Sequence, residues 1–190
     1  MRLIDCNLPS EVRVKDLFTS WYRNFYNSEI RVFLFKFYGN ILGLNSRVTH
    51  FNRDINGGCT FCTISGDLPP PSETFAHLFF DCKCVADVLE TILSRFLGNT
   101  RVSRESFFLA TMGVCEQTNK SYTVFFNLIK YLIWRCKLEK KIPSATKIES
   151  ELQYMMSIFT GASKKLKEQL TNYNIFQNGG NAEPPDAGCP

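Results

Sequence analysis

Apolar side chains recur at intervals of three and four residues along most of this chain, the spacing that predicts amphipathic helices. In residues 11–26 the repeat is largely aromatic, and Ser10 is placed to cap the N-terminus of the predicted helix. Residues 29–38 are ambiguous, because they alternate like a strand and also fill one face of a helix. We favour the helix, which Gly39 ends.

The same spacing continues through the rest of the chain and breaks at residues that stop helices. Pro143 ends the longest predicted helix, and Gly98 ends an earlier one. Residues 178–190 contain almost nothing apolar and are expected to form a disordered tail. The helices predicted in this part are one capped by Ser72 that carries Phe75, Leu78, Phe79 and Cys82, one over 85–96, a short one over 107–114, the longest over 122–140, one starting near Ser144, and a last one marked by Leu166, Leu170 and Tyr173.

One stretch, residues 52–71, departs from this pattern. It contains Gly57-Gly58, Gly66-Asp67 and three consecutive prolines, so we expect an irregular, turn-rich segment. A loop with so few apolar residues cannot offset the entropy lost on ordering by burial alone. Something other than a hydrophobic core must hold it in place.

Four potential metal ligands lie in and after this segment. Cys59 and Cys62 are separated by two residues, and His77 and Cys82 follow at positions five apart. The first pair can bind one ion from a single turn, and a His and a Cys five apart on a helix can point to one side. Four such ligands form a closed tetrahedral site with no open position for water, so we predict one structural Zn²⁺ and no catalysis. The metal would supply the stability that the turn-rich segment lacks.

Two alternatives stay open from the residues alone. The four side chains can also be read as unrelated buried thiols and a core histidine, although the paired spacing favours metal. Cys84 can replace Cys82 as the fourth ligand; we prefer Cys82, because it lies within about one and a half helical turns of His77. Three other cysteines lie in unrelated contexts and are expected to act as small hydrophobic residues: Cys6, Cys115 and Cys136.

Composition is that of a globular protein with a phenylalanine-rich interior. Of 190 residues, 44% are hydrophobic and 14% aromatic, with 17 Phe. No apolar run reaches the roughly 20 residues of a membrane span, and residues 1–5 lack the apolar core of a signal peptide, so neither membrane insertion nor secretion is expected. Eight cysteines then indicate a reducing compartment, where closely spaced cysteines more often bind metal than pair.

The residues around the metal motif form a longer pattern. It comprises Phe35-Lys36, Asn40-Ile41-Leu42, Leu44-Asn45-Ser46-Arg47-Val48, Cys59-Thr-Phe-Cys62 and Glu73-Thr74-Phe-Ala-His77-Leu78-Phe79-Phe80-Asp-Cys82, followed by Val85 and Val88. This pattern resembles the zinc-binding domain found downstream of the polymerase in non-LTR (LINE-type) retrotransposon reverse transcriptases. The resemblance implies that Cys59, Cys62, His77 and Cys82 are the ligands. It also implies binding of template RNA or target DNA during target-primed reverse transcription, and work in the nucleus.

The polymerase itself is not expected in this chain. A polymerase needs paired metal-binding carboxylates, yet no adjacent Asp-Asp occurs, and 190 residues are too few for palm, fingers and thumb. Scattered acidic residues also give no nuclease cluster. The chain therefore resembles an accessory module, and the rest of a reverse transcriptase is a candidate partner.

A local excess of basic residues indicates where nucleic acid would bind. The net charge is only +4, but residues 120–170 contain ten basic residues against four acidic ones. Several of them share one face of the predicted helix over 122–140, with an aromatic ring between lysines that can stack on a base. The alternative is an ordinary solvated lysine face. The candidate contacts are Lys130, Trp134, Lys137 and Lys141 on that face, which also carries Asn127, together with Arg47 and Arg53 near the metal loop.

These patterns predict a mainly α protein in which an irregular, zinc-stabilised loop is followed by a helical bundle. Three parts are expected: 1–98 with the aromatic helices and the metal site, 99–177 as a basic helical subdomain, and the tail 178–190. The predicted function is binding of RNA or DNA, in the nucleus or else the cytoplasm, without a membrane partner. The second hypothesis is a zinc-stabilised module that binds a protein through its aromatic surface and does not bind nucleic acid.

Overall fold

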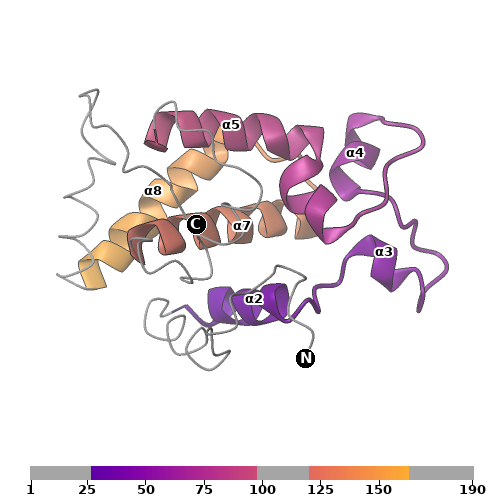
Figure 1. Ribbon diagram of the computed structural model, residues 1–190, viewed down its shortest axis with the longest axis horizontal. Coiled ribbons are helices and arrows are strands. Elements are labelled where there is room, and N and C mark those ends of the chain that lie inside the picture. Colours follow the sequence, from indigo (N-terminus) through magenta and orange to yellow (C-terminus); the bar gives the residue numbers. More distant parts are fainter. Residues whose placement is uncertain (1–26, 98–119, 163–190) are drawn as a thin grey trace, which may run out of the picture.

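The computed structural model describes residues 27–97 and 120–162, which form helices around a shared hydrophobic core (Figure 1). No strand occurs within these ranges, and the mainly α fold expected from the sequence is confirmed. The predictions for 11–26, 107–114, the last helix and the tail fall outside the described residues. The elements are α2 (Ser28–Tyr38), α3 (Asn45–Val48), α4 (Thr60–Ser65), η1 (His77–Asp81), α5 (Lys83–Leu97), α7 (Lys120–Leu138) and α8 (Ala145–Ala162).

Residues 29–38, which the sequence allowed to be either a strand or a helix, form helix α2. The side-chain oxygen of Asn27 accepts hydrogen bonds from the backbone N–H groups of Glu29 (2.7 Å) and Ile30 (3.4 Å), which caps the N-terminus. At the other end, the N–H of Gly39 donates to the carbonyl of Phe35. The helix is therefore fixed by local hydrogen bonds at both ends, and Phe33, Phe37 and Tyr38 are buried in the core.

Three further predicted helices are confirmed as α5, α7 and α8. Helix α7 is 19 residues long and ends at Leu138, a few residues before Pro143. Helix α8 begins directly after Ser144, whose carbonyl accepts from the N–H of Ile148. None of the helices in the two described ranges is both long and apolar enough to span a membrane.

Two local predictions around the metal motif are corrected. Residues 52–71 are irregular except for α4, a six-residue helix. The sequence did not predict this helix, because glycines and prolines surround it. Ser72 does not cap the next helix, because it pairs with Gly58 in an isolated antiparallel β-bridge. The hydroxyl of Thr74 accepts from the N–H of His77 (3.1 Å) instead, so the cap lies two residues later.

Helix α7 is the central helix of the described fold. Helices α2 and α8 both pack against it, and α5 packs against α8 and η1. In Figure 1, α8 crosses between α5 and α7, while α2 lies along the opposite side of α7. The side chains from Val124 to Ile133 are all buried, so this part of α7 has no solvated face. Described residues of both predicted parts, 1–98 and 99–177, thus lie in one hydrophobic core.

An aromatic cluster joins the metal region to this core. Phe33 and Phe37 of α2 pack against Phe79 of η1, with ring centroids 6.4 and 5.0 Å away. Trp134 of α7 stacks on Phe79 at 6.5 Å and contacts Phe33 at 6.3 Å. Aromatic rings at these distances interact beyond the effect of burial alone. The helix that carries the last two predicted ligands is therefore held by apolar packing as well.

Candidate metal centre

The structure brings the four predicted metal ligands together. One ligand atom from each of Cys59, Cys62, His77 and Cys82 lies within 4.8 Å of the other three. The Cys82 sulfur is 3.9 Å from that of Cys59 and 3.7 Å from that of Cys62, and Nε2 of His77 is 3.4 Å from the Cys62 sulfur. Tetrahedral zinc separates two sulfurs by about 3.8 Å, and a sulfur and a nitrogen by about 3.5 Å. The donor set and its spacing therefore fit one tetrahedral metal ion.

Helix α4 positions the first pair of ligands. Cys59 is the residue before the helix and Cys62 lies in its first turn, so both sulfurs approach one point. The N–H of Cys59 donates to the carbonyl of Pro71 (2.7 Å), and the Thr63 hydroxyl donates to the carbonyl of Cys59 (2.8 Å). The backbone of the ligand turn is thus fixed on both sides.

A π-helical turn positions the second pair. In an α-helix, residues five apart point in directions that differ by about 140°, so the expected α-helical arrangement would separate His77 from Cys82. The structure instead forms η1, in which the N–H of Cys82 donates to the carbonyl of His77 (2.7 Å). This i to i+5 bond places the two side chains about one turn apart. Cys84 lies beyond it in α5 and is not part of the cluster.

Burial and mutual contact separate the pKa values of the three thiols. The hydrogen bond with Cys82 lowers the pKa of Cys59 to about 5. Burial raises the pKa of Cys62 to about 11, and the hydrogen bond with Cys59 raises the pKa of Cys82 far above its ordinary range. Without a cation the cluster therefore favours a single thiolate. Three thiolates in this space require a positive ion between them.

Sequence reasoning missed the role of Glu73, which is completely buried beside the metal ligands. Its carboxylate accepts hydrogen bonds from the backbone N–H groups of Asn45 and Thr60, both at 2.8 Å, and forms an ion pair with Lys137. The signal available in the sequence was that Glu73 carries a carboxylate four residues before the predicted ligand His77. Its burial depends on α7, which is far away in the sequence.

The predicted nucleic-acid face of α7 is corrected, because most of it points into the protein. Lys130 is fully buried, with its ammonium 4.7 Å from the centre of the Phe37 ring. Lys137 is 9% exposed and Trp134 is half-buried in the aromatic cluster. The face is directed inward because α7 is the central helix, and neither lysine presents its charge to a phosphate in this structure.

The other three predicted contacts lie nearer the surface. Lys141 is exposed and pairs with Glu139 at 3.0 Å. Arg47 is half-buried and donates to the side-chain oxygen of Asn40 (2.6 Å) and to its carbonyl. Arg53 is exposed in the loop between α3 and α4. The neighbouring Phe51 is 92% exposed, which its sequence context did not indicate.

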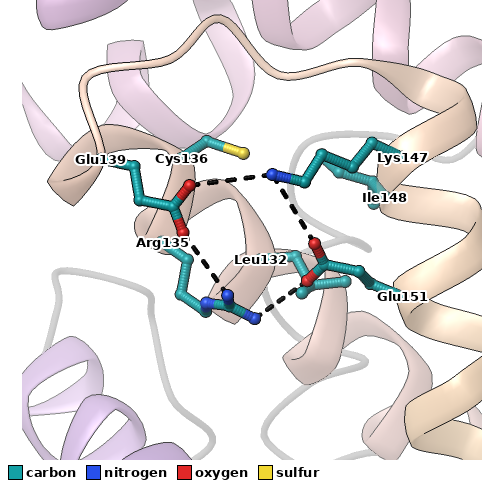
Figure 2. A pocket seen from close by; sticks show the side chains of 7 residues that line it. All are labelled: Leu132, Arg135, Cys136, Glu139, Lys147, Ile148 and Glu151. Carbon is teal, nitrogen blue, oxygen red and sulfur yellow. Dashed lines mark hydrogen bonds and ion pairs between the residues drawn. The ribbon is translucent and has the colours of Figure 1, made fainter.

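A pocket between α7 and α8 contains a second group of charged side chains (Figure 2). Arg135 pairs with Glu151 (2.9 Å) and Glu139 (3.4 Å), and Lys147 approaches the same two carboxylates at 3.8 and 3.7 Å. Burial raises the pKa of the adjacent Cys136 and keeps its thiol protonated. The charges satisfy one another, so this group joins the two helices.

Comparison of the chain with known protein families, with curated proteins and with solved structures finds no significant match. The resemblance to the reverse-transcriptase zinc-binding domain therefore rests on the residues of this chain alone.

Proposed function

We propose that Cys59, Cys62, His77 and Cys82 bind one structural Zn²⁺, and that the folded chain is an accessory nucleic-acid-binding module of the reverse-transcriptase type it resembles. The observation that carries this proposal is the donor cluster, whose spacing fits tetrahedral zinc. Bound zinc would neutralise the thiolates and crosslink the loop to η1. With four protein ligands no position is left for a reacting water, so the proposed role is binding without catalysis.

The exposed loop beside the metal centre is the surface on which we expect nucleic acid to bind. Phe51 is 92% exposed, and Arg53 follows it two residues later. A solvated aromatic ring can stack on an unpaired base while a neighbouring guanidinium contacts phosphate. The loop begins where the short helix α3 ends, with the N–H groups of Phe51 and Asn52 donating to the carbonyl of Val48, so its first residues are held by hydrogen bonds. This location replaces the buried face of α7 in the proposal.

The test combines metal content with a binding assay. Elemental analysis of the untagged chain is expected to give one zinc per chain, lost in the Cys62→Ser variant. Labelled single-stranded RNA and DNA oligonucleotides are then titrated over a salt series. We expect Arg53→Ala to reduce the salt slope by about one phosphate contact and Phe51→Ala to weaken binding at every salt concentration. Leu68→Ala is the control, because Leu68 is 87% exposed but neither aromatic nor charged.

Each part of the proposal can fail separately. If the chain folds without zinc, the proposed metal centre is wrong, and the resemblance no longer supports the proposed function. If the chain binds zinc but neither oligonucleotide, the nucleic-acid role is wrong, while the proposal of a metal site still holds.

The second candidate, a protein-interaction module, is supported by the outer face of α2. Val32 is 52% exposed and Phe35, one turn later, 45% exposed. Apolar side chains at neighbouring surface positions are typical of protein contacts. Salt separates the two candidates, because phosphate-driven binding weakens steeply as salt rises and apolar contacts do so far less.

A further inference from the structure

The buried carboxylate of Glu73 lies where the two halves of the metal centre and the central helix meet. Its Oε2 accepts from the N–H (2.8 Å) and hydroxyl (2.7 Å) of Thr60, the residue directly after the ligand Cys59. Its Oε1 accepts from the N–H of Asn45 (2.8 Å), and Nζ of Lys137 is 3.3 Å away. One side chain therefore contacts α3, α4 and α7.

These contacts satisfy backbone N–H groups at the start of two short helices that have no side-chain cap. The residues before α3 and α4, Leu44 and Cys59, make no capping hydrogen bond with their side chains. Asn45 and Thr60 are the first residues of the two helices, and their N–H groups are among those that find no acceptor within a helix. Glu73 accepts both. A helix as short as α4 is not stable in isolation, so the direction of the Cys59–Cys62 turn depends on this carboxylate.

Lys137 places an opposite charge beside the carboxylate in this enclosed place. Its ammonium also donates to the carbonyl of Gly43 (3.1 Å) and the side-chain oxygen of Asn45 (3.5 Å), and it lies 4.9 Å above the Trp134 ring. An unpaired charge at this depth would be strongly unfavourable, so the two residues depend on each other. The backbone of Glu73 is fixed as well, since its N–H donates to the carbonyl of Gly57 and its carbonyl accepts from the Ser46 hydroxyl.

We propose that Glu73, paired with Lys137, is the positioning residue of the metal centre: it holds the Cys59–Cys62 turn in the ligand arrangement and links the centre to α7. This inference rests on the proposed zinc site and goes beyond it, because it assigns the geometry of the site to a residue that does not touch the metal. Residues that hydrogen-bond to metal ligands typically change metal affinity by about 10- to 100-fold when they are substituted, and Glu73 acts on the ligand turn through Thr60, the neighbour of Cys59.

The test measures zinc affinity by competition with a chromophoric chelator, and ligand geometry from the absorption spectrum of bound Co²⁺. We expect Glu73→Gln to weaken zinc binding at least tenfold and to alter the Co²⁺ spectrum, and Lys137→Met to act in the same direction. The double variant Glu73→Gln/Lys137→Met removes both charges and is expected to recover part of the affinity. Glu151→Gln is the control, because it removes an ion pair to α7 far from the ligands in sequence.

Thr60→Val covers the case in which Glu73→Gln does not fold. It removes one hydrogen bond and leaves the charge pair in place, and we expect a several-fold loss of zinc affinity with an altered Co²⁺ spectrum. Wild-type affinity and an unchanged spectrum in Glu73→Gln, or in Thr60→Val if only that variant folds, would overturn the inference while leaving the zinc site standing. If the wild-type chain itself takes up no zinc, the proposed metal centre fails and this inference fails with it.

Discussion

The hydroxyl of Tyr38 donates a 2.8 Å hydrogen bond to the side-chain oxygen of Asn127, and both side chains are buried. The bond joins the end of α2 to the middle of α7, 89 positions away along the chain. A polar residue in the centre of a buried helix is tolerated when its hydrogen bonds are satisfied. Asn127, which shares a helix face with the lysines of α7, is therefore part of the core.

Tyr38→Phe is expected to destabilise the protein by about 1–3 kcal/mol, because it deprives a buried amide oxygen of a donor. Tyr131→Phe is the matched comparison. It removes a bond of the same length, from Tyr131 to Glu29, but Glu29 is exposed and water replaces the lost donor. Urea denaturation should show the larger loss for Tyr38→Phe. Equal losses would contradict the importance of burial at this bond.

Tyr131 also predicts a pH dependence. Burial raises the pKa of Tyr131 to about 12, with the hydrogen bond to Glu29 acting in the same direction. Its ordinary value in an unfolded chain is about 10. The folded state therefore favours the protonated form, and this contribution to stability is present below pH 10 and is lost as the pH rises toward 12. The stability difference between wild type and Tyr131→Phe should decrease over that range in denaturation curves.

The choice of fourth ligand is tested by two serine substitutions. Cys82→Ser removes a sulfur that lies 3.7–3.9 Å from two other ligands, so zinc content should fall from one per chain toward zero. Cys84→Ser changes a half-buried residue outside the cluster and should leave zinc content unchanged. Elemental analysis measures the zinc content of both variants, and thermal unfolding measures their stability. Loss of zinc in Cys84→Ser alone would show that the second pair of ligands is wrongly assigned.

Gly58 is expected to tolerate no side chain. A Cβ at this position would lie 2.5 Å from Cγ of Pro70, a ring that cannot rotate away, next to the bridge with Ser72. Gly58→Ala should therefore destabilise the protein by about 1–3 kcal/mol through overpacking. Gly43→Ala is the control, since its nearest neighbour would be Val48 at an ordinary 3.8 Å. Thermal unfolding of the zinc-loaded proteins should separate the two variants clearly.

The local parts of this protein follow from its sequence. Periodicity predicted α5, α7 and α8, because a helix is specified by residues three and four apart and by its nearest stop signals. The paired spacing of cysteines and histidine predicted the metal cluster, since such ligands converge over short stretches of chain. The helix–strand ambiguity of α2 was resolved by its cap at Asn27, which is also a local signal.

Tertiary structure decided which faces are inside. In the sequence, the lysine face of α7 cannot be distinguished from a face that contacts water. Lys130 is buried because α2 packs against it, and Lys137 is buried beside Glu73 and the carbonyl of Gly43. Likewise, Glu73 becomes a positioning candidate only because Lys137, 64 positions later, reaches it. A sequence determines which residues lie near one another on a single helix; whether that helix faces water or the core depends on contacts between distant segments, which local spacing does not encode.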